Sequence, residues 1–239
     1  MQLKVAVVIA LGIEANILKT LRGGVQNSSI DLYQCGPGAA RATEAARAAV
    51  EAGAGALVSW GLAGGLVPEL APGTVLLPKR ILVAAGEPLD TDPDWRASVV
   101  EAMGLEFAVH DGDLLTADDV LKTPRMKASA ARSSGGVAVD MESAAIAQVA
   151  ANADLPVIVL RVVADGANDY LPANIDQWID ARGQRRLAPA LGVVFRPSQW
   201  STLLILARRY RVAQSVLTKL AQRLVPLSFA VSPRSVRYS

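Results

Sequence analysis

Apolar and polar positions along the first 165 residues form two kinds of segment that follow one another. Short runs that are apolar at nearly every position, such as 3–10 (LKVAVVIA) and 157–163 (VIVLRVV), are typical of strands buried on both faces of a sheet. Between such runs lie stretches whose apolar residues recur at helical spacing. This alternation of strands and helices predicts an α/β domain with a mostly parallel sheet.

The pattern places the expected strands at 3–10, 30–35, 56–60, 74–83, 106–110, 114–116, 137–139 and 157–163, and the expected helices at 14–21, 39–52, 94–103, 123–132 and 140–151. The strand at 56–60 is expected to break at once into the glycine run 61–65, as a tight turn or as a loop that approaches a ligand. Ligands of such sheets gather at the carboxyl ends of the strands. Chemistry is therefore expected near Glu14, 36–38, 61–65, 116–118, 141–142 and Asp165.

Composition excludes several classes of protein. The 239 residues are 51% hydrophobic and 19% charged, against about 25% charged in an average chain, so the sequence has ample apolar surface for a core. One cysteine and one histidine exclude a disulfide framework and a metal site built from either residue type. The sequence shows no secretory signal and no run of roughly 18 apolar residues. We expect a cytoplasmic protein without metal or cofactor and with no nucleic-acid partner.

Charge is distributed unevenly, and the C-terminal part is basic. Residues 1–180 contain 13 Lys/Arg against all 22 Asp/Glu, a net charge of −9, whereas 181–239 contain 11 Lys/Arg and no acid. We therefore divide the chain into a catalytic domain at 1–190, a basic helical extension at 191–227 and a disordered tail at 228–239.

Residues 200–225 are expected to form an amphipathic helix. Its apolar stripe consists of Leu203, Leu206, Ala207, Tyr210, Ala213, Leu217, Leu220 and Leu224. Arginines and lysines lie near or opposite this stripe, as in helices that lie on anionic bilayers. Two interpretations stay open: peripheral contact with the inner face of the membrane, or packing on the domain or on a second subunit.

Two acidic segments are candidates for chemistry. Asp140 and Glu142 stand where a strand meets a helix, so either can cap the helix, or Glu142 can bind sugar hydroxyls while Met141 packs on the ribose. Asp165 ends a buried strand directly before Gly166, a sequence that is also common in plain turns.

Three segments together resemble the superfamily of nucleoside phosphorylases and 5′-methylthioadenosine/S-adenosylhomocysteine nucleosidases. They are GLAGGL at 61–66, AVDMESAAIAQVA at 138–150 and LRVVADGAND at 160–169, and ALGIEANIL at 10–18 and TADD at 116–119 agree in order and spacing. The resemblance covers about residues 1–185. It is greatest to the hopanoid-biosynthesis-associated phosphorylases, which share the leucine of GLAGG and a basic C-terminal extension. The resemblance implies a three-layer α/β/α fold around a central mixed sheet, with the C-terminal helix added, and a homodimer or larger assembly.

The resemblance also implies roles for nine residues. Asp165 would protonate N7 of a leaving purine, and Glu14 would orient and deprotonate the attacking water. Glu142 would bind the ribose hydroxyls above Met141. The remaining members would line the substrate pocket: Ala63, Gly64, Val120, Leu121 and Val139. The implied reaction cleaves the N-glycosidic bond of an adenine nucleoside with a large apolar 5′ group, similar to adenosylhopane, and releases adenine.

Several positions depart from the family pattern. Leu62 replaces a serine that positions the nucleophile, Ala164 replaces a hydroxyl residue beside the acid, and Val120 replaces an aromatic that stacks on adenine. No arginine stands at 59–60, where hexameric phosphorylases bind phosphate. Phosphate needs donors and positive charge, so water is slightly favoured as nucleophile, with phosphate left open.

Other functions also stay open at this point. Within the family, they are a methylthioadenosine/S-adenosylhomocysteine nucleosidase and a general purine nucleoside phosphorylase. Outside it, they are a dinucleotide-dependent oxidoreductase and a non-catalytic nucleoside-binding scaffold. His110, Cys35, Trp60 and the pair 168–169 are expected to be structural.

Overall fold

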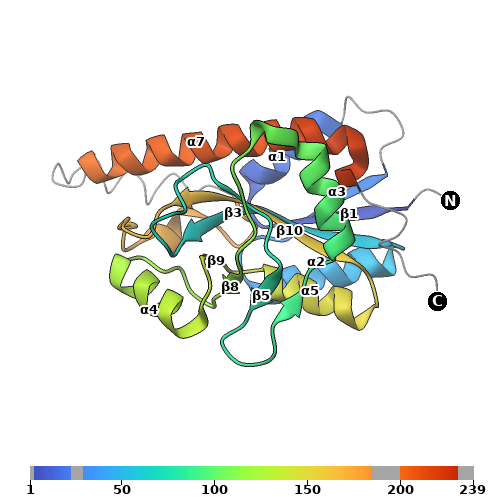
Figure 1. Ribbon diagram of the computed structural model, residues 1–239, viewed down its shortest axis with the longest axis horizontal. Helices are drawn as coiled ribbons and strands as arrows, with labels where there is room; N and C mark the ends of the chain where they lie inside the picture. The colour runs from blue at the N-terminus through green and yellow to red at the C-terminus, as the bar shows by residue number, and fades with distance from the viewer. Residues whose placement is uncertain (1–2, 23–28, 185–199, 231–239) are drawn as a thin grey trace.

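A mixed β-sheet lies between two layers of helices (Figure 1). The computed structural model describes residues 3–22, 29–184 and 200–230. On one face lie α1 (Gly12–Arg22), α3 (Pro93–Met103) and α7 (Trp200–Leu224), and on the other lie α2 (Ala39–Glu51) and α5 (Ser143–Asn152). The expected three-layer α/β/α fold with a C-terminal helix is confirmed.

The centre of the sheet is parallel and its flanks are mixed. The parallel core runs in the order β2 (Ile30–Gln34), β1 (Val5–Ile9), β3 (Ala56–Gly65) and β10 (Val157–Asp165). Antiparallel partners join it at β9 (Ala138–Asp140), which pairs with β3, and at β4 (Val75–Leu76), which pairs with β10. The flanks are completed by β8 (Leu114–Thr116), β5 (Arg80–Leu82), β6 (Leu89–Asp90) and β7 (Val109–His110).

The central strands carry apolar side chains on both faces. In β10, Ile158, Leu160 and Val162 pack toward α1, α3 and α7, whereas Val159 and Val163 pack toward α2 and α5. Because successive side chains of a strand point to opposite faces, a strand between two helical layers buries apolar side chains on both faces. This geometry explains the uninterrupted apolar runs in the sequence.

Most predicted elements are confirmed, and the differences are local. The expected strand 74–83 divides at Pro78 into β4 and β5, and the strand 106–110 is reduced to β7. The helix expected from residue 140 begins at Ser143. Helix α4 (Pro124–Ser134) begins after Thr123, whose hydroxyl accepts a hydrogen bond from Met126 N.

The glycine run 61–65 does not break its strand, and that expectation was wrong. β3 continues to Gly65, paired in parallel with β10 and, at Gly64 and Gly65, antiparallel with Val139 and Ala138 of β9. Glycines stand here because neighbouring side chains lie against the strand where Cβ atoms would be.

The second half of α7 belongs to the core of the domain. Ala213, Leu217, Leu220 and Leu224 are fully buried in the apolar cluster that α1 and α3 also line. The interpretation in which this helix packs on the domain is therefore correct for these positions. A membrane-facing stripe is wrong from Ala213 onward, because lipid cannot reach these side chains. Among the described residues, no helix is both long and apolar enough to cross a bilayer.

A 3-10 segment, η4 (Val225–Ala230), closes the core after α7. Phe229 is fully buried, its carbonyl oxygen accepts a hydrogen bond of 2.8 Å from Trp95 Nε1, and its ring meets Trp60 edge to face at 5.5 Å. Residues 228–230 therefore do not belong to a disordered tail, whereas 191–199 and 231–239 lie outside the described residues. Trp60 is a core residue, as expected.

Two leucines of α7 test this placement. We expect Leu217→Ala to lower the free energy of unfolding by about 2–5 kcal/mol, because it leaves a cavity in the core. Leu204→Ala is the matched control on the same helix; its side chain is 67% exposed, and a change within about 0.5 kcal/mol is expected. Urea unfolding measures both. Equally small changes would contradict the packing of α7 in the core.

Candidate active site

One cavity of about 340 Å³ lies at the edge of the sheet where β3, β9 and β10 end. All nine predicted site residues line it: Glu14, Ala63, Gly64, Val120, Leu121, Val139, Met141, Glu142 and Asp165. They come from five separate segments of the sequence, which the sheet brings together. Their roles stay predictions, which the geometry below develops.

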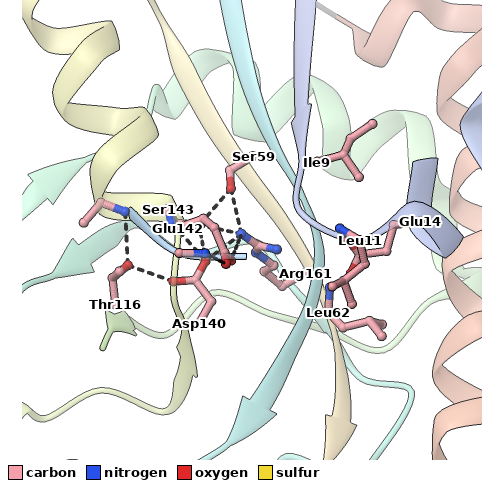
Figure 2. A network of polar contacts seen from close by, with 12 residues as sticks. Ile9, Leu11, Glu14, Ser59, Leu62, Thr116, Asp140, Glu142, Ser143 and Arg161 are labelled. Atoms are coloured by element: carbon pink, nitrogen blue, oxygen red, sulfur yellow. Dashed lines mark hydrogen bonds and ion pairs between the residues drawn. The ribbon is translucent and has the colours of Figure 1, made fainter. Parts of the chain in front are cut away.

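A buried arginine organises one end of the cavity. Arg161 of β10 is 2% exposed, and its Nη2 lies 2.7 Å from Asp140 Oδ2, 2.9 Å from Ser59 Oγ and 3.6 Å from Glu142 Oε2. Figure 2 shows the guanidinium between these groups and Glu14. A buried cation needs such partners, because its removal from water is costly. Arg161 was not among the residues predicted from the sequence, although a charge inside the apolar run VIVLRVV indicates a buried ion pair.

The two carboxylates at the β9–α5 junction have different partners. Asp140 accepts hydrogen bonds from Thr116 Oγ1 at 2.8 Å and from Ser143 N at 3.1 Å, so it fixes the start of α5 (Figure 2). Glu142 accepts one from Gly38 N at 2.9 Å and lines the cavity. The capping interpretation therefore applies to Asp140, and Glu142 is the carboxylate placed for a ligand. Burial raises the pKa of Glu142, and Arg161 opposes that rise.

Glu14 is held by two backbone amides. Leu11 N donates to its Oε2 at 3.0 Å, and Leu62 N donates to its Oε1 at 2.9 Å (Figure 2). Burial raises the pKa of this carboxyl to about 7, although Arg161 and the two amides favour the ionised form. A carboxylate with a pKa near neutrality is suited to accept a proton from water. The contact from Leu62 uses its backbone, so it does not require the serine side chain of the family pattern.

Glycines in β3 make room for both ends of the site. A Cβ on Gly61 would lie 2.5 Å from Arg161 Nη1 and 2.7 Å from Glu14 Oε1. A Cβ on Gly64 would lie 3.3 Å from Asp165 Oδ2 and also 3.3 Å from Val139 Cγ1. The glycine run therefore lets acidic and basic side chains lie against the strand itself.

Asp165 forms an ion pair with a buried lysine that the sequence analysis did not select. Lys127 Nζ contacts Asp165 Oδ2 and also donates to Gly166 O at 2.7 Å. Burial raises the pKa of Asp165, whereas Lys127 and the more distant Arg209 act to lower it. Nothing in the sequence separates Lys127 from an ordinary surface lysine, because it stands in a largely polar helix.

The first half of α7 forms part of the cavity wall. Leu206 and Tyr210 line the cavity. Arg209 forms an ion pair with Asp169, whose Oδ2 accepts a hydrogen bond of 2.8 Å from Gly166 N. The expectation that 168–169 belong to a turn is confirmed. The same contacts fix α7 to the turn that follows Asp165.

The described residues contain no group of three His, Cys, Asp or Glu side chains arranged to hold a metal ion. His110 lies outside the cavity lining, and its Nδ1 accepts a hydrogen bond of 3.0 Å from Gly112 N. Cys35 is partly buried at the end of β2, and its thiol donates to Ile9 O at 3.4 Å.

Comparisons with known proteins identify the family of the chain. The family model described as the phosphorylase superfamily matches residues 11–191. A 5′-methylthioadenosine/S-adenosylhomocysteine nucleosidase of Shewanella pealeana is 28% identical over 151 residues, which cover 54% of this chain and 64% of that relative. The match therefore spans slightly less than two thirds of the relative's length.

Two solved structures share the fold. A 5′-methylthioadenosine/S-adenosylhomocysteine nucleosidase from Helicobacter pylori with butyl-thio-DADMe-Immucillin-A has a TM-score of 0.69 and 17% identity, over 92% of this chain and 98% of that one. The native futalosine hydrolase of the same organism has a TM-score of 0.64 and 19% identity, over 69% and 88% of the two chains. At these identities, the likeness establishes the fold alone.

The raised pKa of Glu14 predicts a pH-dependent cost to stability. Its folded-state pKa of about 7 exceeds the ordinary value of 4.5, so the folded protein binds the proton more tightly than the unfolded chain. Its contribution to the free energy of unfolding therefore falls as pH rises from 4.5 through 7, by about 3 kcal/mol in total. Glu14→Gln does not titrate, so we expect this variant to gain stability relative to the wild type between pH 5 and pH 8.

Urea unfolding at both pH values measures the difference, and Glu44→Gln on the exposed face of α2 is the control. A Glu14→Gln difference that stays constant across this range would contradict the assigned pKa.

Proposed function

The chain belongs to the phosphorylase superfamily, and from this premise we propose that it cleaves the N-glycosidic bond of an adenine nucleoside. The observation that carries the proposal is the pairing of Glu14 and Asp165 in one cavity. Glu14 lies against Gly61 and Asp165 against Gly64 of the same strand, and both side chains line the cavity. A base and an acid are therefore available to one bound nucleoside.

Asp165 supports departure of the purine. Breaking the C1′–N9 bond leaves the electron pair on the base and positive charge on the sugar. A proton delivered to N7 neutralises the base as it leaves and so lowers the barrier. Burial of Asp165 raises its pKa, which favours the protonated carboxyl. Val120, Leu121 and Val139 supply apolar walls for the flat base.

Glu142 and Met141 support binding of the ribose. One carboxylate oxygen of Glu142 is fixed by Gly38 N, and the carboxylate lines the cavity, where it can accept hydrogen bonds from sugar hydroxyls. Met141 lies in the same lining, where its thioether can pack on the sugar ring. Both assignments follow the roles predicted from the sequence.

Water is the nucleophile that the charges of the cavity favour. The two cations in the lining, Lys127 and Arg161, are each paired with carboxylates. The acidic residues of the lining outnumber them: Glu14, Asp119, Asp140, Glu142, Asp165 and Asp176. A phosphate dianion would enter against this negative charge, whereas water needs only Glu14 to accept its proton. We therefore assign hydrolysis rather than phosphorolysis.

Methylthioadenosine and S-adenosylhomocysteine are the first candidate substrates, because the curated relative is named for them. A larger apolar 5′ group, as in an adenosylhopane-like nucleoside, is the second. The observation in its favour is an apolar wall built by α7 and the segment after β10, consisting of Leu171, Ile175, Ile179, Leu206 and Tyr210. Homodimer assembly and a cytoplasmic location stay predictions.

Peripheral membrane contact is proposed only for the beginning of α7. Leu204 and Ile205 are 67% and 52% exposed there, directly beside cavity-lining Leu206. A lipid-linked nucleoside would reach the cavity past these residues. Leu203, the first residue of the predicted stripe, is not among the side chains described.

Adenine release tests the proposed function. We expect the wild type to release adenine from methylthioadenosine. Faster release from an adenine nucleoside with a long alkylthio group at the 5′ carbon would favour the second candidate substrate. Asp165→Asn is nearly isosteric, cannot donate the proton and should lower kcat by about 10²–10⁴-fold. Chromatography of the released base measures the rate.

Asp111→Asn, in an exposed ion pair with Lys79, is the matched control and should keep the wild-type rate. If Asp165→Asn and the wild type released adenine at the same rate, the assignment of Asp165 as the general acid would be wrong. Faster cleavage of the nucleoside with the short 5′ group would support a methylthioadenosine nucleosidase and would exclude the larger nucleoside as the preferred substrate.

A further inference from the structure

Lys127 is the only buried lysine among the residues that the structure describes. It is 1% exposed in α4, lines the cavity, and bonds to Asp165 Oδ2 and Gly166 O. Burying an ammonium group costs several kcal/mol unless it is well paired. Because Lys127 is buried in direct contact with the candidate acid, its role is expected to concern Asp165.

The ion pair conflicts with the simplest role for Asp165. An acid must carry a proton when the base leaves, whereas an ammonium in direct contact favours the ionised carboxylate. When Asp165 is ionised in this ion pair, the transferable proton at the contact is on Nζ of Lys127. Proton donation must therefore draw on the two groups together.

We propose that the acid of the reaction is the Lys127–Asp165 pair, in which Lys127 is the positioning residue that supplies the proton. Nζ gives a proton to Oδ2, and the resulting carboxyl gives it to N7 as the C1′–N9 bond breaks and its electron pair moves to the base. The step leaves a neutral base, an ionised Asp165 and a neutral amine, which then takes a proton from solvent. This inference rests on the proposed function.

The other charged groups near Asp165 cannot replace Lys127. Arg209 of α7 is the second cation that acts on Asp165, and it is bound to Asp169 in the turn after β10. A guanidinium does not release its proton in proteins, so Arg209 contributes only charge. Lysine ammonium groups ordinarily release their proton at far higher pH than carboxyls do, so an acid that draws on an ammonium group is expected to act at higher pH than a lone carboxyl.

Two variants separate proton supply from charge and from hydrogen bonding. Lys127→Arg keeps a charged donor that cannot release its proton, and Lys127→Gln keeps a neutral donor. We expect each to lower kcat for methylthioadenosine by about 10²–10⁴-fold. Lys79→Met, which removes a lysine from an exposed Lys–Asp pair, is the control and should have the wild-type rate.

A second substrate removes the need for the acid. In a 4-nitrophenyl riboside with the same 5′ group, the leaving group is 4-nitrophenolate, a stable anion that departs without being protonated. We expect both Lys127 variants to retain its cleavage within about tenfold of the wild type, because the sugar and water sites are intact. Equal losses on both substrates would show a merely structural role for Lys127 and overturn the proposal.

The alkaline limb of kcat/KM against pH gives an independent result. If the pair is the acid, Lys127→Gln leaves a lone carboxyl and moves this limb to lower pH. If Lys127 only lowers the pKa of Asp165, the same variant moves the limb to higher pH, and the proposal is wrong. If the wild type releases adenine and the Lys127 variants do so at the same rate, only the proposed role of Lys127 as the proton source is refuted. If the wild type releases no adenine, the proposed function itself is refuted.

Discussion

The site depends on the ion pairs that the buried guanidinium of Arg161 forms with Asp140 and Glu142. Arg161 stands in β10, a strand covered by helices on both faces, so its charge must be balanced by side chains rather than by water. Asp140 and Glu142 provide that balance, and Glu14 lies on the other side of the guanidinium (Figure 2). Loss of Arg161 would leave these carboxylates buried without their counterion, so fold and chemistry share one constraint.

Helix α7 connects stability with the shape of the cavity. Its second half fills the core with Leu217 and its neighbours, while Leu206 and Tyr210 of its first half line the cavity. The contact of Arg209 with Asp169 joins the helix to the turn after Asp165. The C-terminal segment is therefore part of the domain, and its sequence determines which groups can occupy the cavity.

The layers could be predicted from the sequence because they follow from local pattern, whereas the full lining of the cavity was predicted from the family resemblance. Strand burial appears as uninterrupted apolar runs, and the strand ends locate Glu14, Glu142 and Asp165. Contacts between distant segments leave no such pattern. The glycine run looked like a turn because Arg161 and Glu14, which lie against Gly61, come from other parts of the chain. Likewise, an amphipathic stripe has the same spacing whether it faces lipid or a core, and the pairing of Lys127 with Asp165 is purely tertiary.

In the proposed reaction, the site directs water, activated by Glu14, to the sugar carbon of an adenine nucleoside. The most direct measurement is mass spectrometry of the sugar released from methylthioadenosine in ¹⁸O-labelled water, with and without added phosphate. Hydrolysis places one ¹⁸O atom at C1 of the free sugar and proceeds at a rate that phosphate does not change. A sugar 1-phosphate without the label, formed only when phosphate is present, would contradict it.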